Sequence, residues 1–362
     1  MYRRAYLTLI GTAAIMGALA WYVAAEYDQP LLDPEGAFLG PSWLRLPLLT
    51  FLAVVLDLLP RALIFSRFRL RIMPAVIRER LRTHWTRERW TLVAMGICAF
   101  YVTYVSYRNL KSALPFVRPF TDASEMFDRE LNTLDRILFL GHQPGPVLHD
   151  ILGTSVAAHV LSVIYLWFVP LVPLAITAWA VWARKYSHGY WFVASQCLAW
   201  SLGTLSYYAL PTLGPAFHYP SGYQDLSATG TTTLIKALKT SRDKVLYGGY
   251  DGTSVEGVVN SVAGFASLHC GITLLVALMI QFTVRNVWLK RMFWVNFGLT
   301  IVATLYFGWH YVADDIAGCM IALVSFYLGG VATGQRFDRT RRRSEPAEKK
   351  LGQHADEVPV RQ

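Results

Sequence analysis

The sequence predicts an all-α fold: a polytopic membrane bundle of about eight transmembrane helices. Three observations lead to this fold class. Of the 362 residues, 54% are apolar and only 16% are charged, a balance typical of multi-pass membrane proteins. The apolar residues gather in eight runs that are close to, or above, the roughly 18 residues needed to cross a bilayer. Basic residues concentrate between alternate runs, as the positive-inside rule predicts for such a protein.

The eight runs are each expected to be one helix. They are residues 5–25, 43–60, 90–107, 154–183, 189–209, 267–284, 292–309 and 315–334. The first run follows Arg3 and Arg4 and is open to two interpretations, an uncleaved anchor or a cleaved signal sequence, of which its length favours the anchor. All four cysteines fall inside predicted spans, so no external disulfide framework is expected.

The basic residues also predict an orientation. They cluster at the N-terminus, in segment 61–89, in two short turns and in the tail beyond Arg336. With eight spans these segments share one side, so both termini are expected in the cytoplasm, beneath the plasma membrane. Segments 108–153 and 210–266 then face outward, together with the turn at His310. The net charge of +10 is attributed to contact with anionic lipid of the bilayer, and no nucleic-acid partner is expected.

Two histidines and one aspartate lie where predicted spans open on the outward side. His310 and Asp314 occur in Phe307-Gly-Trp-His-Tyr-Val-Ala-Asp-Asp-Ile-Ala-Gly318, and His269 occurs in Phe265-Ala-Ser-Leu-His-Cys-Gly271. A spacing of four places His310 and Asp314 on one helical face. An aspartate that holds one imidazole nitrogen leaves the other free as a nucleophile or base. These three residues are predicted to be catalytic, whereas Asp315 is expected only to solvate the helix end.

The motifs resemble those of a known family. Ser267-Leu-His269 followed by His310-Tyr-Val-Ala-Asp314 is similar to the second and third motifs of the type 2 phosphatidic acid phosphatase superfamily. Within it, they look most like the inositol phosphorylceramide synthase branch (inositolphosphotransferases) and its bacterial relatives. Lys111-Ser-Ala-Leu-Pro-Phe-Val-Arg118-Pro119 fits the first motif. The resemblance implies catalysis by the two histidines and Asp314, with Lys111, Arg118 and Ser267 binding the phosphate.

One departure from the superfamily concerns an anion ligand. The third motif usually carries Ser-Arg ahead of its histidine, and Ala303 and Thr304 stand there instead, as tends to be so in the synthase branch. Residues 134–141, Leu-Asp-Arg-Ile-Leu-Phe-Leu-Gly, resemble another stretch of that branch. Arg136 is therefore a candidate for the missing ligand, the alternative being a surface ion pair with Asp135.

The chemistry can also be built from the residues. Negative oxygens protect a phosphate ester from attack, so cations must neutralise them. Lys111 and Arg118 supply such cations, unless they are ordinary interfacial side chains that extend toward water. In the expected reaction His310 attacks phosphorus and forms a phosphohistidine. His269 protonates the leaving oxygen and then deprotonates the incoming alcohol or water. This scheme needs no metal and no other cofactor.

Residues 1–89 are expected to be accessory spans and a basic loop, residues 90–335 the catalytic domain, and residues 336–362 a disordered tail. The expected function is transfer of a phosphate-containing head group from a phospholipid or polyprenyl-phosphate substrate to an alcohol. One alternative is a lipid phosphate phosphatase that uses water. Others are a metal enzyme in which two histidines and one carboxylate form a facial triad, and a non-enzymatic lipid or solute transporter.

The outward segments carry two further expectations. Residues 123–140 are predicted to form an amphipathic helix on the membrane surface, with Met126, Leu134 and Leu138 on its apolar face. Segment 210–266 is long enough to act as a lid. His142, His149 and His218 share this side, but no spacing connects them to the site, so they are expected to be bystanders.

Overall fold

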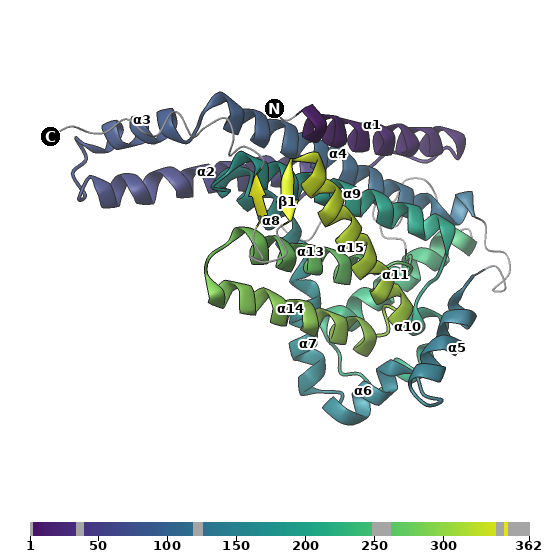
Figure 1. Cartoon of the computed structure of the whole chain (residues 1–362). Helices are drawn as coiled ribbons and strands as arrows, with labels where there is room; N and C mark the ends of the chain where they lie inside the picture. Colours follow the sequence, from purple (N-terminus) through teal and green to yellow (C-terminus); the bar gives the residue numbers. More distant parts are fainter. Residues whose placement is uncertain (1–2, 34–39, 119–125, 248–261, 338–343, 347–362) are drawn as a thin grey trace.

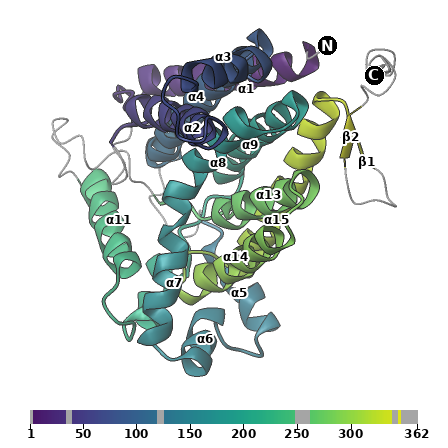
Figure 2. The same ribbon diagram turned by 90° about the vertical axis from the view of Figure 1, so that its left-hand side faces the viewer.

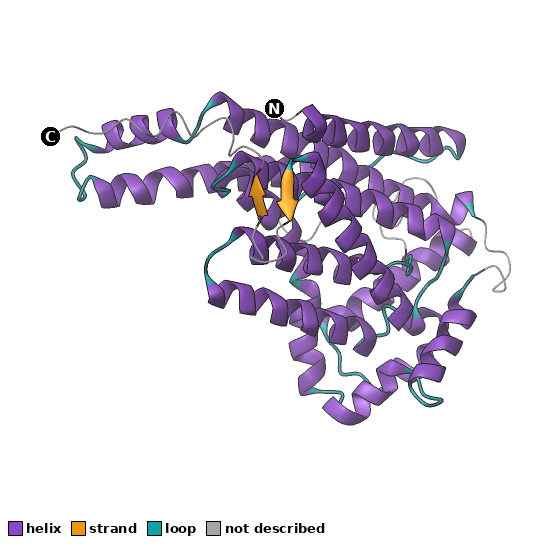
Figure 3. Ribbon diagram, in the orientation of Figure 1, coloured by secondary structure: helices purple, strands orange, loops and turns teal. Residues whose placement is uncertain are grey.

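A computed structural model describes residues 3–33, 40–118, 126–247, 262–337 and 344–346. These residues form a helical bundle with one short hairpin of strands near the C-terminus (Figure 1, Figure 3), so the predicted fold class is confirmed. The N-terminal half contains α1 (Arg3–Glu26), α2 (Ser42–Phe65), α3 (Met73–Thr83), α4 (Arg87–Val117), α5 (Asp128–Leu138), α6 (Pro144–Leu152), α7 (Val156–Leu166) and α8 (Phe168–Trp182). The remainder contains α9 (Tyr186–Ala209), α10 (Pro215–His218), η2 (Pro220–Tyr223), α11 (Gly230–Tyr247), α13 (Leu268–Thr283), α14 (Val287–Tyr306), α15 (Val312–Ala332), β1 (Gln335–Phe337) and β2 (Ser344–Pro346).

All eight predicted runs are helical. α1, α2, α4, α15 and the pair α7–α8 are long and apolar enough to cross a membrane on their own. α13 is apolar but has only 16 residues, and α9 and α14 carry more polar residues. The run predicted at 154–183 is divided at Trp167, where α7 ends and α8 begins. Several apolar helices make this a multi-pass membrane protein, while the number of crossings and the side of each terminus stay predictions.

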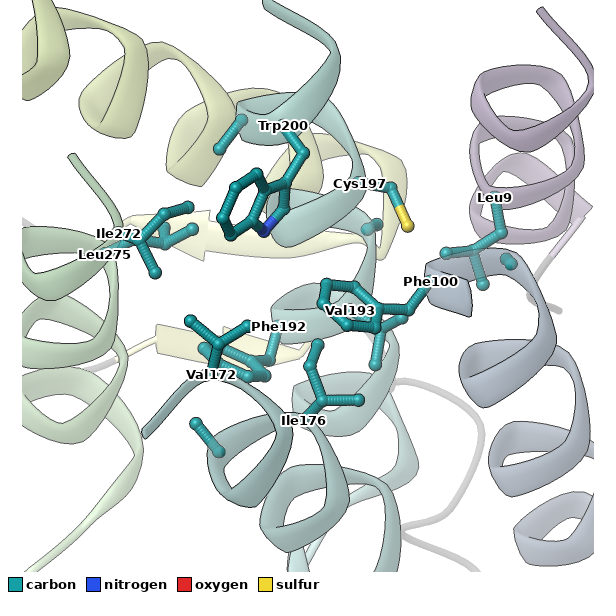
Figure 4. Close-up of a cluster of buried hydrophobic side chains, with 14 of the residues drawn as sticks. Leu9, Phe100, Val172, Ile176, Phe192, Val193, Cys197, Trp200, Ile272 and Leu275 are labelled. Atoms are coloured by element: carbon teal, nitrogen blue, oxygen red, sulfur yellow. The ribbon is translucent and has the colours of Figure 1, made fainter. Parts of the chain in front are cut away.

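α9 lies inside the bundle, with Trp191, Phe192 and Trp200 almost completely buried. Its neighbours contribute the rest of the core, including Leu9 of α1, Phe100 of α4, Val172 and Ile176 of α8, and Ile272 and Leu275 of α13 (Figure 4). α1 therefore packs into the same core as the helices that carry the histidines. The outer faces of α1, α2 and α15 instead expose large apolar side chains such as Trp21, Phe51 and Met320, as lipid contact requires.

α2 and α3 form a hairpin that extends from one end of the bundle (Figure 1). Asp57, buried on α2, accepts hydrogen bonds from Arg80 Nε at 2.9 Å and Nη2 at 2.7 Å. Trp85 Nε1 donates to the same carboxylate at 3.1 Å. A buried carboxylate is stable only when paired in this way, so Asp57 holds the hairpin closed. At the other end of the chain, β1 pairs with β2, and the remainder of the predicted disordered tail lies outside the described residues.

α5 differs from the predicted surface helix. It covers Asp128–Leu138 instead of 123–140, and its buried side chains are polar, namely Asp128, Asn132 and Asp135. Met126, predicted on the apolar face, is buried at 8% exposure, while Leu134 and Leu138 are exposed. The helix therefore turns polar groups toward the protein and part of its apolar face outward, because those polar groups have partners there.

Candidate active site

Ser267 caps the first turn of α13. Its side-chain oxygen accepts from the amide of Cys270 at 3.4 Å, and its own amide donates to the carbonyl oxygen of Asp314 at 2.9 Å. Ser267 is fully buried, so it acts at a helix start as serine commonly does. Its backbone contact with Asp314 joins the start of α13 to the start of α15. His269, two positions after Ser267, is thereby placed beside the motif that contains His310.

His310 and Asp314 form the predicted pair, but they do not share a helical face, because His310 precedes the N-cap Tyr311 of α15 and lies outside the helix. His310 Nδ1 lies 3.4 Å from Asp314 Oδ2, and the same oxygen accepts from the amide of Tyr311 at 2.9 Å. Asp314 is fully buried and His310 is 7% exposed. Because Nδ1 faces the carboxylate, Nε2 is the nitrogen left for a substrate.

His269 faces His310 across a short gap. The centroids of the two imidazole rings are 6.4 Å apart. Tyr165 stacks on His269 with a centroid distance of 4.3 Å and an angle of 12°, and Phe168 lies at 4.0 Å. Trp309 continues the stack beyond Tyr165 at 5.1 Å. These aromatic rings fix the plane of His269 and keep water from that side of the imidazole.

Two glycines permit the close approach of α13 and α15. A Cβ on Gly318 would collide with the carbonyl oxygen of Ser267, and one on Gly271 would lie 2.7 Å from the carbonyl oxygen of Gly318. The separation of the two histidines therefore depends on the absence of side chains at this crossing.

Gly318→Ala is expected to push α13 away from α15. Overpacking of this kind costs about 1–3 kcal/mol of stability, and a displacement near 1 Å at a reacting group lowers activity about 10²-fold. Thermal unfolding and turnover in detergent measure the two effects. Gly298→Ala on α14 is the matched control, since a Cβ there meets no atom within 4 Å. Equal behaviour of the two variants would contradict this role of the crossing.

Asp315 does not solvate the helix end, so that expectation is wrong. It is 4% exposed, and its carboxylate accepts from Cys270 Sγ at 3.0 Å and from Thr304 Oγ1 at 2.9 Å. These partners come from α13 and α14, so Asp315, on α15, connects three helices. Thr304 occupies the place where the superfamily's third motif usually has arginine. Here that position binds a carboxylate of the protein.

α5 supplies two buried carboxylates that the sequence analysis did not assign to the site. Asp128 accepts from the hydroxyl of Tyr311 at 2.9 Å and from the amides of Leu213 and Gly214. Asp135 accepts from the amide of Val312 at 3.1 Å. Burial raises the pKa of Asp135 to about 7, and the nearby carboxylates of Asp314 and Asp315 act in the same direction. The hydrogen bond from the amide of Val312 opposes this shift only in part. Both aspartates hold the segment that follows His310, and the only sequence signal was the polar face of α5.

The predicted phosphate ligands lie at different depths. Lys111 Nζ lies over the ring of Tyr207, 5.7 Å from its centroid, and it is close enough to His269 to act on it electrostatically. Arg118 is exposed at the end of α4, where its Nη1 donates to the carbonyl oxygen of Tyr208 at 3.1 Å. Lys111 is thus within electrostatic range of His269, while Arg118 lies at the exposed end of α4.

Arg136 is exposed on α5. It lines a cavity of about 610 Å³ together with Arg129, Asn132 and Tyr219. The proposed ion pair with Asp135 does not form, because Asp135 instead binds the start of α15. Among the described residues, no contact joins Arg136 directly to either histidine.

Other polar groups near the site have structural partners. His149 Nε2 lies 2.8 Å from the carbonyl oxygen of Tyr306, and its Nδ1 lies 3.4 Å from Asp225 Oδ1. This buried histidine therefore holds the end of α14. In the part of the chain that the structure describes, no three His, Cys, Asp or Glu side chains are grouped so as to hold a metal ion, and the facial-triad alternative gains no support.

Comparison with known proteins gives one match. The family model described as the PAP2 superfamily matches residues 129–328, which is more than half of the chain. The match includes α5 after its first residue, Asp128, and both histidine motifs, and it leaves out Lys111 and Arg118. No curated protein and no solved structure matches the chain.

Proposed function

Because the chain belongs to the PAP2 superfamily, and is thus a membrane enzyme of the lipid phosphatase and phosphotransferase class, we propose that it transfers a phosphate-containing head group from a lipid to an alcohol through a phosphohistidine on His310. One observation carries this proposal. His310 turns Nδ1 to Asp314 and lies opposite His269, with 6.4 Å between the ring centroids. Two imidazoles this close can act on one phosphorus centre, one as the nucleophile and the other as the proton donor.

The first step transfers the phosphoryl centre to the enzyme. His310 Nε2 attacks phosphorus, a nitrogen–phosphorus bond forms, and the bond from phosphorus to the lipid oxygen breaks. His269 gives its proton to that oxygen, which leaves as the lipid alcohol. In the second step an acceptor alcohol loses its proton to His269 and attacks phosphorus, which restores free His310. Asp314 stabilises the positive charge that His310 carries in each transition state.

Cationic and amide groups surround the place of the phosphate. Lys111 supplies charge beside His269. At the start of α13, the amides of Leu268 and His269 have no acceptor within the described residues, so these donors suit phosphate oxygens. Ser267 caps this turn. We place Arg118, at the exposed end of α4, where the head group of the substrate enters the site.

We assign Arg136 to the head group and not to the reacting phosphate. With Arg129 and Tyr219 it lines the cavity of about 610 Å³ on α5, and arginine binds phosphates and polyols through several donors. α5 also holds the start of α15 through Asp135. A head group bound in this cavity therefore contacts the helix that positions the segment after His310. The choice of an alcohol acceptor over water rests on the resemblance to the inositol phosphorylceramide synthase branch.

Product analysis tests transfer against hydrolysis. Purified protein in lipid nanodiscs, given a phosphatidylinositol donor labelled with radioactive phosphorus, is expected to produce a new labelled phosphodiester when a lipid alcohol is added. Arg136→Gln is expected to raise KM about tenfold or more, since it removes a charge-assisted contact, with a smaller effect on kcat. Arg78→Gln, an exposed arginine on α3, is the control. Release of inositol phosphate alone, unchanged by any alcohol, would favour the phosphatase alternative.

The reaction is also expected to be independent of divalent metal. The site offers Lys111 and amides for the phosphate charge, and the described residues contain no metal-ligand cluster. Turnover should persist in EDTA, and vanadate should inhibit it by occupying the place of pentacoordinate phosphorus. Turnover lost in EDTA and restored by zinc or manganese would instead favour the facial-triad alternative.

A further inference from the structure

A second groove opens at the end of the bundle opposite the histidines. It has a volume of about 820 Å³, within the usual range for ligand pockets. α8 and α14 form its walls and α13 its floor, and Figures 1 and 2 show these helices side by side. Its lining along the helices is apolar and includes Leu171, Ala175, Trp179, Val276, Ile280 and Phe293.

Four cationic side chains surround one end of this groove. Arg184 and Lys185 come from the turn between α8 and α9, Arg285 from the turn between α13 and α14, and Lys290 from the first turn of α14. No aspartate or glutamate is among the lining residues, and none of the four cations forms an ion pair within the described ranges. The rim is therefore a concentration of positive charge without a partner from the described protein.

The position of the rim indicates which part of the bilayer it meets. His269 and Thr283 lie near opposite ends of α13, and 14 residues of helix span about 21 Å. The cations therefore lie at the membrane face opposite the histidines. Along α8, the groove runs from Trp182 to Trp167, a helical length of about 22 Å. One leaflet of the hydrocarbon core is about 15 Å deep, so the groove is long enough for an acyl chain.

We propose that this groove binds one anionic glycerophospholipid from the leaflet opposite the catalytic histidines. The phosphate would be held by the four cations, with arginine offering two parallel hydrogen bonds, and an acyl chain would lie between α8 and α14. Such a lipid joins two walls that otherwise meet mainly through α13. Its phosphate site is separate from that of the substrate because His310 and the four cations lie at opposite ends of the bundle, although the far end of the groove, at Trp167, is next to Phe168, which contacts His269.

The test is lipid binding by the full-length protein, measured by native mass spectrometry. Phosphatidylglycerol is expected to remain bound as one molecule, about tenfold or more tighter than phosphatidylcholine with the same chains. A variant with Arg184→Gln, Lys185→Gln, Arg285→Gln and Lys290→Gln should lose this preference. The matched control carries Arg67→Gln, Arg69→Gln, Arg71→Gln and Arg78→Gln, which removes the same charge from the α2–α3 hairpin, and should keep it.

A second variant tests the groove without a change of charge. Ala178→Trp fills the apolar part and is expected to release the bound phosphatidylglycerol while all four cations remain. Equal retention of the two lipids, equal loss in the groove and hairpin variants, or full binding by Ala178→Trp would each overturn the proposal. The first two results would indicate non-specific attraction to basic protein, and the third would place the lipid elsewhere.

Discussion

A donor lipid carrying radioactive phosphorus is expected to label the wild-type protein on a histidine and to leave His310→Ala unlabelled. The reason is geometric, since Asp314 holds Nδ1 of His310 and leaves Nε2 as the nucleophile. Turnover of His310→Ala should fall by on the order of 10⁴ or more, because loss of a nucleophile removes the covalent route altogether. Quenching in alkali, which preserves phosphohistidine, followed by peptide mapping identifies the labelled residue.

His269→Ala is expected to behave differently. The variant keeps the nucleophile but lacks the proton donor, so a natural lipid donor should react slowly, by about 10²–10⁴-fold. A nitrophenyl phosphate ester has a leaving group that needs little protonation, so it should still label His310. The label should then persist, because no base remains to activate the acceptor. Label on His269 in the wild-type protein would reverse the two roles, and near-normal turnover of both variants would refute the catalytic assignment.

The sequence predicted the histidine pair because its determinants are local. His310 and Asp314 are only four residues apart, and Asp314 lies in the first turn of α15 while His310 precedes its N-cap, Tyr311. Their contact therefore comes from the capped start of the helix and not from one helical face, but it is still set by residues that are close in sequence. The eight helical segments could also be predicted from the sequence, since each is a run of apolar residues. The meeting of His269 with His310 also followed from the parity of the spans, without knowledge of how the helices pack.

The hydrogen-bond partners of α5 could not be predicted from the sequence. Asp128 and Tyr311 are 183 residues apart, and no periodicity connects them. The apolar residues of 123–140 predicted a helix with its polar side in water, which is the default for an amphipathic helix. The structure buries that polar side because Tyr311, Val312, Leu213 and Gly214 provide donors for its carboxylates. Only the fold reveals such donors.

The burial of Asp315 could not be predicted from its position on α15 alone. Its position beside Asp314 suggested exposure at a helix end, but α13 and α14 cover that side. Cys270 and Thr304 then satisfy the carboxylate. The same helix start therefore carries two buried acids with different partners, Asp314 paired with His310 and Asp315 with Cys270 and Thr304. This difference makes the two residues a matched pair for experiment.

Asp314→Asn is expected to lower turnover by about 10²–10⁴-fold, as the equivalent change does in a Ser-His-Asp triad. Asp314 Oδ2 accepts from the amide of Tyr311 and is also the oxygen nearest His310 Nδ1. If the asparagine keeps its oxygen there, both contacts remain, but the negative charge that stabilises a positively charged His310 is lost. If its NH₂ group takes that place, it donates to Nδ1 and favours the tautomer with a proton on Nε2, which blocks the nucleophile.

Asp315→Asn is the control, because it makes the same change one position away without touching His310. It removes charge from bonds to Cys270 and Thr304, so the expected result is lower thermal stability with turnover within about tenfold of wild type. Asp314→Asn should show the opposite pattern, a large loss of turnover at nearly wild-type stability. A pH profile separates the two further, since raising the pH should not restore Asp314→Asn if the wrong nitrogen carries the proton. Equal losses of turnover in both variants, in step with equal losses of stability, would mean that Asp314 only supports the fold.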